Sequence, residues 1–166
     1  MVMKTVLAFV IGIIAGAGFV GVTAWSMAPS LMLTEVESPY GVEETVAKIK
    51  EGAEKVNRER GTRWVSPSVK PLHKSIKKHG GPDLLPVMLV ELCEPHHAGD
   101  ILSHDQDRII SVMMPCTVSV YQKSDGKTYI GHMNAGLMGS MFSSNVAKVM
   151  SEVNAQQQEF LAFAKR

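Results

Sequence analysis

The sequence predicts an α+β fold, in which an antiparallel sheet packs against two main helices, preceded by one N-terminal transmembrane helix. Three patterns support this prediction. Residues 6–24 form an uncharged apolar run, two later stretches repeat apolar residues every three or four positions, and several short apolar runs are separated by Pro, Gly and Asp. The first pattern is typical of a membrane span, the second of amphipathic helices and the third of strands.

The apolar run Val6–Ala24 contains nineteen residues and no charge. About 20 apolar residues cross a bilayer as a helix, whereas the apolar part of a cleavable signal is usually about 7–15 residues long. We therefore expect residues 1–28 to be an N-terminal anchor or uncleaved signal that contacts membrane lipid through residues 5–27. Val22-Thr23-Ala24 also suits signal peptidase, so cleavage stays an alternative.

The charges around this run predict where the rest of the chain lies. Lys4 precedes the run, and the first charged residues after it are acidic. This distribution favours an inside amino terminus, so residues 29–166 are expected to be a single globular domain exported to the periplasm and tethered to the cytoplasmic membrane by one span. With Lys4 set aside, 16 basic residues face 16 acidic ones. A balanced charge does not suit nucleic acid as a partner.

Two long amphipathic helices are predicted in the exported part. Each has apolar residues at spacings of three and four, and Gly61 is expected to end the first helix. The two apolar faces consist of Val42, Val46, Ile49, Ala53 and Val56 in the first helix, and Phe142, Val146, Val149, Val153 and Phe160 in the last. Shorter helices are expected near residues 71–78 and 96–102.

The strands are predicted from short apolar or β-branched runs. We expect them near residues 31–36, 63–69, 86–92, 109–121 (interrupted by Pro115) and 128–133. Residues 86–92 are nearly all apolar, which is typical of a strand in the middle of a sheet. Residues 124–127 (Ser-Asp-Gly-Lys) have the composition of a hairpin turn, so the last two strands should pair. Residues 104–107 are expected to form a polar loop.

The two cysteines are the first candidates for chemistry. Cys93 lies at the end of one predicted strand, and Cys116 follows Met113-Met114-Pro115. In an exported protein two cysteines first suggest a disulfide, which stabilises a fold by about 3 kcal/mol. If Cys93 and Cys116 lie on neighbouring strands, they come within the distance that a bridge requires.

The alternative keeps both thiols reduced and uses them in a site for a soft metal or for haem. Thiolate, imidazole and thioether ligands suit copper, and they also serve as axial ligands to haem. The candidate ligands are Cys93, His96, His97, Met113, Met114, Cys116, His132 and Met133. Their spacing is not diagnostic, because it contains neither the C-x-x-C-H of covalent haem nor paired C-x-x-C zinc motifs. Methionine is also an ordinary filler of apolar cores.

Enzyme chemistry has less support in the sequence. Cys116 lies in an apolar stretch, where burial raises the pKa of a thiol and suppresses its reactivity. The glycines at positions 136 and 139 do not follow the phosphate-binding P-loop pattern. No catalytic residues are therefore predicted, and a thiol-redox protein remains only an alternative.

Five short motifs occur in the order typical of one bacterial family. They are Cys-Glu-Pro at 93–95, Met-Pro-Cys at 114–116, Val-Tyr at 120–121, Asp-Gly at 125–126 and Met-Asn-x-x-Leu-Met at 133–138. Over residues 35–153 the chain thereby resembles the domain of unknown function 302 family. The resemblance implies a compact α+β domain, often exported and often self-associating, and it implies no established reaction. The paired histidines after Pro95 are not part of the resemblance.

The sequence thus predicts a membrane-tethered envelope domain that binds a ligand or a protein partner without catalysing a reaction. A second hypothesis is a structural subunit of a larger membrane complex. In that case Gly12 and Gly16, spaced as G-x-x-x-G, pack the membrane helix against another helix. A homo-oligomer is compatible with either hypothesis.

Overall fold

The computed structural model describes residues 30–114 and 116–164. The chain divides into two compact units, residues 1–32 and 33–166, and the fold below is that of the second. The predicted anchor, with Gly12 and Gly16, lies outside the described residues. Within the part that the structure describes, no helix is long and apolar enough to cross a membrane.

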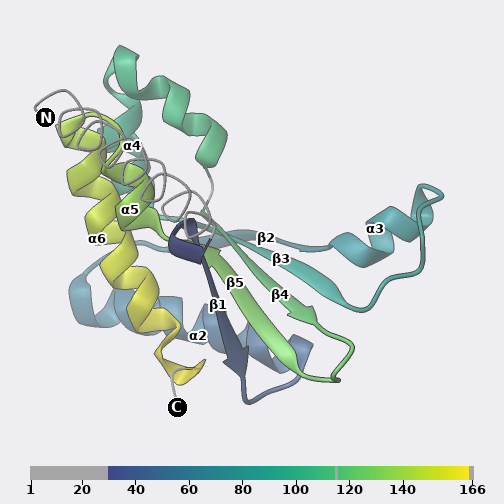
Figure 1. Cartoon of the computed structure of the whole chain (residues 1–166). Helices are drawn as coiled ribbons and strands as arrows, with labels where there is room; N and C mark the ends of the chain where they lie inside the picture. The colour runs from purple at the N-terminus through teal and green to yellow at the C-terminus, as the bar shows by residue number, and fades with distance from the viewer. Residues whose placement is uncertain (1–29, 115, 165–166) are drawn as a thin grey trace, which may run out of the picture. The chain divides into compact units, whose positions relative to one another are not determined.

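A five-stranded antiparallel sheet forms the centre of the unit (Figure 1). The strands are β1 (Leu33–Ser38), β2 (Val65–Pro71), β3 (Val87–Cys93), β4 (Cys116–Gln122) and β5 (Thr128–Met133), in the spatial order β1-β5-β4-β3-β2. The helices are α2 (Val42–Arg60), α3 (Leu72–Lys78), α4 (Pro95–Leu102), α5 (Ala135–Gly139) and α6 (Ser144–Phe160), with two 3₁₀ helices, η1 (Asp105–Met113) and η2 (Ala162–Ala164). The predicted α+β class and the antiparallel sheet are confirmed.

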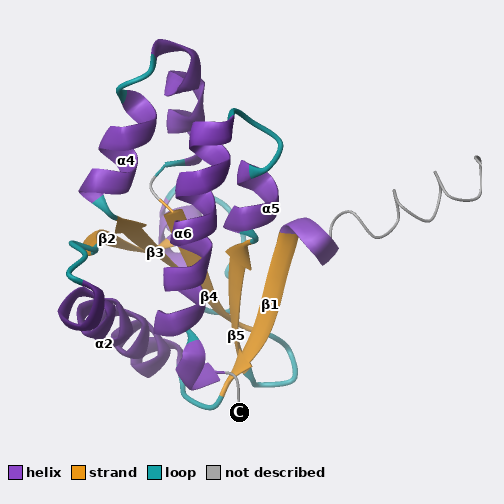
Figure 2. Ribbon diagram, turned by 90° about the vertical axis from the view of Figure 1, so that its left-hand side faces the viewer, coloured by secondary structure: helices purple, strands orange, loops and turns teal. Residues whose placement is uncertain are grey.

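One face of the sheet forms the core with the two long helices (Figure 2). Side chains alternate along the strands, so the buried apolar residues are Val90 and Leu92 in β3, Val118 and Val120 in β4, and Ile130 in β5. The predicted apolar faces of α2 and α6 are buried, except for Phe142, which precedes α6 and is exposed. Gly61, with φ +68°, ends α2 as predicted, because glycine accepts the left-handed conformation.

The predicted strand over residues 109–121 is wrong in its first half. Residues 105–113 form η1, and β4 begins at Cys116. Residues 104–107 are accordingly not a simple polar loop, because Asp105–Asp107 open η1. The 3₁₀ helix repeats every three residues, which buries Asp107 and Ile110 and exposes Ile109. An apolar run of this length is compatible with either structure, so its composition did not decide between them.

Candidate functional site

The end of β3 and the start of α4 are fixed by one buried carboxylate. Glu94 is 4% exposed and precedes Pro95 at the first position of α4. Its Oε2 accepts a hydrogen bond from the backbone N–H of His97 at 2.7 Å, and its Oε1 accepts one from the backbone N–H of Arg63 at 3.0 Å. Glu94 therefore caps α4 and ties it to the segment that leads into β2.

His97 is held over the core by a buried amide. The Oε1 atom of Gln156 accepts a hydrogen bond from the indole Nε1 of Trp64 at 2.6 Å and lies 3.3 Å from Nε2 of His97. Because Trp64 is a donor only, the amide oxygen must face it, and His97 then donates through Nε2–H. The imidazole also meets the Trp64 ring edge-on at 6.4 Å. This leaves Nδ1 as the lone-pair nitrogen of neutral His97.

Beneath α4 lies a small, partly open cavity, which we call the α4 cavity. Its volume is about 30 Å³. Its lining consists of Trp64, Leu92, Cys93, Glu94, His97, Ala98, Ile101, Ile110, Met113, Met114, Cys116, Val149, Met150 and Val153. A volume of this size holds one or two water molecules, whereas sites for cofactors usually measure about 300–1,000 Å³. The cavity thus admits an ion or a very small molecule but not haem.

Five of the eight predicted ligands line the α4 cavity: Cys93, His97, Met113, Met114 and Cys116. The two cysteines come close because Leu92 of β3 pairs with Cys116 of β4, which places Cys93 and Cys116 at the same end of two neighbouring strands. His96, His132 and Met133 are not among the residues that line it. His96 is exposed on α4, while His132 is buried in β5 with Nδ1 3.2 Å from the carbonyl oxygen of Met133.

The two thiols are free in the structure and are poor nucleophiles at neutral pH. Burial raises the pKa of Cys116 to about 11, and the nearby Cys93 adds to this shift. The pKa of Cys93 is raised by burial first and then by the negative charge of Glu94. The predicted disulfide stays a prediction, with both partners lining one cavity.

Within the described residues, no three His, Cys, Asp or Glu side chains are grouped so that they could hold a metal ion. The two thiols and His97 alone therefore do not form a conventional metal site. The Met113 and Met114 thioethers supply the further soft donors that this part of the cavity contains.

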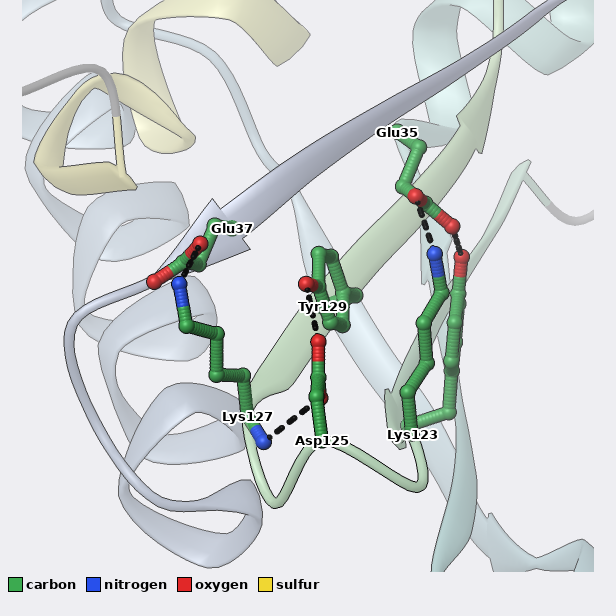
Figure 3. A network of polar contacts seen from close by, with 7 residues as sticks. Glu35, Glu37, Lys123, Asp125, Lys127 and Tyr129 are labelled. Carbon is green, nitrogen blue, oxygen red and sulfur yellow. Dashed lines mark hydrogen bonds and ion pairs between the residues drawn. The ribbon is translucent and has the colours of Figure 1, made fainter.

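A second cluster of polar side chains lies on the other face of the sheet and joins β1 to the β4–β5 hairpin (Figure 3). Glu35 accepts hydrogen bonds from Lys123 at 2.5 Å and from the Tyr121 hydroxyl, and these bonds lower the pKa of the Glu35 carboxyl. Tyr129 donates to Asp125 at 2.8 Å, and Lys127 reaches Glu37 at the same distance. Each charged member has a partner of opposite charge or a hydroxyl donor, which is the arrangement of a structural clamp.

A larger hollow of about 520 Å³ lies beside this clamp, between the β1–α2 loop and the β4–β5 hairpin. Its lining is mostly polar, with Glu37, Tyr40, Gln122 and Lys127 among its residues. Although it exceeds the α4 cavity in size, Glu37 and Lys127 already neutralise each other there. The α4 cavity is the better candidate site, because chemically distinctive donors converge on it.

Sequence reasoning missed Glu94 and Gln156, although both left a signal. Gln156 continues the spacing of Val149, Val153 and Phe160, which places an amide on the buried face of a helix. A buried amide needs a partner. Glu94 directly precedes a proline at a helix start, which is the position of a capping residue.

The model of the family described as "Domain of unknown function DUF302" matches residues 34–164. The chain belongs to this family. The predicted resemblance is thus confirmed and extends through α6. The family is defined without a function, so membership establishes no reaction, ligand or partner.

A DUF302 protein of known structure has the same fold. The structure, "Crystal structure of uncharacterized conserved protein DUF302 from Bacillus stearothermophilus", aligns with a TM-score of 0.68 and 18% sequence identity, covering 81% of this chain and 98% of that one. At this identity the likeness establishes the fold alone. A search of curated proteins found no match.

Proposed function

We propose that this DUF302 protein is a membrane-tethered envelope domain that binds a single soft cation, Cu(I), in the α4 cavity. The observation that carries the proposal is that residues bearing two thiols, two thioethers and an imidazole line one small cavity. Soft sulfur ligands select Cu(I) among the common biological metals, and Cu(I) accepts low coordination numbers that two thiols and one thioether satisfy.

The size of the cavity supports an ion over a larger cofactor. A volume of about 30 Å³ accepts one cation once any water has left it. Haem, the other cofactor that suits such donors, does not fit without rearrangement of α4 or η1. A partly apolar lining of Leu92, Ile101 and Val149 would also protect a bound Cu(I) from water.

The chemistry of the thiols supports binding rather than catalysis. Their raised pKa values keep both in the neutral form at pH 7, so neither is an activated nucleophile. Metal binding replaces the thiol protons and releases them to solvent. Binding should therefore strengthen as pH rises, with Cys93 and Cys116 each releasing one proton.

The membrane tether rests on the apolar run Val6–Ala24. A retained anchor with its amino terminus inside holds the domain at the periplasmic surface of the cytoplasmic membrane. At this place the domain would act as a carrier or buffer of the ion.

Titration of the reduced full-length protein with Cu(I), in competition with a coloured Cu(I) chelator, tests the proposal. We expect one equivalent to bind, and Cys116→Ser or Met114→Leu to weaken binding at least about tenfold, which corresponds to about 1.4 kcal/mol. Met141→Leu is the matched control, because Met141 is exposed and does not line the cavity. Absence of binding, or equal weakening by all three variants, would overturn the proposal.

The structural-subunit alternative is tested separately. Gly12→Leu or Gly16→Leu should abolish co-purification of a membrane partner if the glycine face packs against another helix. Neither glycine is a candidate Cu(I) ligand, so Cu(I) binding should be unchanged. Recovery of the same partners with both variants would reject the alternative.

A further inference from the structure

One end of the sheet gathers elements that are far apart in the sequence. The register pairs Leu33 with Met133 and Leu92 with Cys116. The start of β1, the end of β5, the start of β4 and the end of β3 therefore lie at one end, together with α4, η1 and α5. In Figures 1 and 2 the β4–β5 hairpin lies at the opposite end. We call the former the α4–α5 end.

The helix η1 exposes an apolar row at this end. Ile109 is 73% exposed and Val112 is 84% exposed. They are three residues apart, and in a 3₁₀ helix residues at this spacing lie on one line. The neighbouring row, with Ile110 and Met113, faces the α4 cavity. The core of the domain thus leaves the Ile109–Val112 row uncovered.

A second apolar group lies on the segment between α5 and α6. Met141 is 57% exposed and Phe142 is 44% exposed. The first turn of α6, which directly follows this segment, is adjacent to η1 and α4, because the side chain of Asn145 in α6 donates to Asp107 in η1 at 3.4 Å and to the carbonyl oxygen of Asp100 in α4 at 3.2 Å. The exposed side chains of η1 and of the α5–α6 segment therefore belong to one end of the domain.

The chain enters the domain at the same end. β1 begins at Leu33, opposite Met133, and α5 begins two residues after Met133. If the lipid-contacting segment ends at residue 27, residues 28–32 connect it to β1. Five residues span at most about 18 Å, so the α4–α5 end stays close to the bilayer surface.

We propose that the α4–α5 end lies on the bilayer and inserts Ile109, Val112, Met141 and Phe142 into its interface. The proposal rests on the tether in the proposed function and adds a fixed orientation to it. Apolar side chains gain free energy when they leave water for the lipid interface, and the short connection supplies the proximity. Because η1 carries both the inserted row and part of the cavity wall, the ligand site would lie directly above the membrane.

Spin-label accessibility in the full-length protein tests this orientation. Labels are attached at Val112→Cys, at Phe142→Cys and at the control Leu85→Cys, each in a Cys93→Ala, Cys116→Ala background. The protein is reconstituted in vesicles of phosphatidylethanolamine and phosphatidylglycerol. Leu85 is also exposed, at 48%, but it precedes β3 at the opposite end. Circular dichroism of each labelled protein verifies the fold.

We expect collisions with oxygen to exceed those with a water-soluble nickel chelate several-fold at positions 112 and 142, and the reverse at position 85. Water-like accessibility at all three positions in vesicle-bound protein would overturn the orientation while leaving the tether intact. Exclusion of both reagents at 112 and 142 would overturn it in favour of a protein contact. Protein that does not float with the vesicles would reject the tether itself and this proposal with it.

Discussion

At the scale of single residues, Gln156 is the polar centre of the candidate site. Its Oε1 serves Trp64 and His97, and both Gln156 and its neighbour Gln157 are nearly fully buried. Among the described residues, the Gln157 Oε1 has no hydrogen-bond partner. The side-chain oxygen of Gln156 thus links two residues by hydrogen bonds, whereas that of the adjacent Gln157 links none.

Gln156→Leu should destabilise the fold by about 1–3 kcal/mol, because the indole N–H of Trp64 would be buried without an acceptor. Gln157→Leu is the matched control and should change stability by less, or increase it, since no acceptor bond is lost. Urea unfolding of both variants measures the difference. Equal destabilisation would show that the Gln156 hydrogen bonds contribute no more than the volume of the side chain.

The rate at which Cys116 is alkylated should depend steeply on pH. Burial raises both pKa values, that of Cys116 to about 11, so both are neutral at pH 7. Only the thiolate reacts, and at pH 7 a pKa of about 11 leaves a thiolate fraction of about 10⁻⁴. The rate at Cys116 should therefore rise about tenfold per pH unit from 7 to 10.

Mass spectrometry after iodoacetamide pulses measures this dependence, with urea-unfolded protein as the control. In the unfolded chain both thiols should ionise near their ordinary pKa of about 8.5. A native Cys116 rate that levels off below pH 9 would contradict the raised pKa and would restore the thiol-redox alternative. No reaction in either state without reductant would indicate the predicted disulfide.

At the scale of elements, two helical glycines differ in whether the packing around them leaves room for a side chain. A Cβ at Gly52 of α2 would lie 2.5 Å from the Phe160 carbonyl oxygen and 2.8 Å from its Cβ, so Gly52 lets α2 approach the end of α6. Apart from its chain neighbours and the backbone of α4, a Cβ at Gly99 would meet no atom of the described residues within 4 Å. The first glycine is required by packing, and the second is not.

Gly52→Ala should therefore destabilise the fold by about 1–3 kcal/mol through overpacking. Gly99→Ala should stabilise it by up to about 1 kcal/mol, because alanine is the better helix former. Thermal unfolding compares the two substitutions. Loss of stability with Gly99→Ala would mean that α4 requires backbone freedom beside the cavity.

The elements that sequence reasoning predicted are those with local causes. The apolar spacing of Val46, Ile49 and Val56 depends on α2 alone, and the turn at Gly126, with φ +79°, needs only a glycine. The α4 cavity has no local cause, because it depends on the register that places Cys116 opposite Leu92. Nothing local showed that Cys116 and His97 would line one cavity while His132 would not.

At the scale of the whole molecule, the cavity, the exposed side chains of Ile109, Val112, Met141 and Phe142, and the start of β1 lie at the same end of the domain. The clamp of Glu35 and Lys123 lies on the other face of the sheet and joins β1 to the hairpin. The polar side chains that hold β1 to the hairpin are therefore separate from the candidate site. The proposed contact of the α4–α5 end with the bilayer depends on whether the anchor stays attached.

We expect the mature protein to keep its anchor. An apolar run of nineteen residues exceeds the length typical of a cleavable signal, so intact-mass measurement of protein extracted from membranes should give the full 18.1 kDa chain. Ala24→Leu is the control, because it removes the small residue that signal peptidase needs and should leave the mass of an uncleaved chain unchanged except for the substitution. A wild-type chain that begins near residue 25, beside a full-length Ala24→Leu variant, would instead make the domain a free periplasmic protein. The bilayer would then no longer hold the α4–α5 end close, and neither the tether nor the proposed orientation would survive.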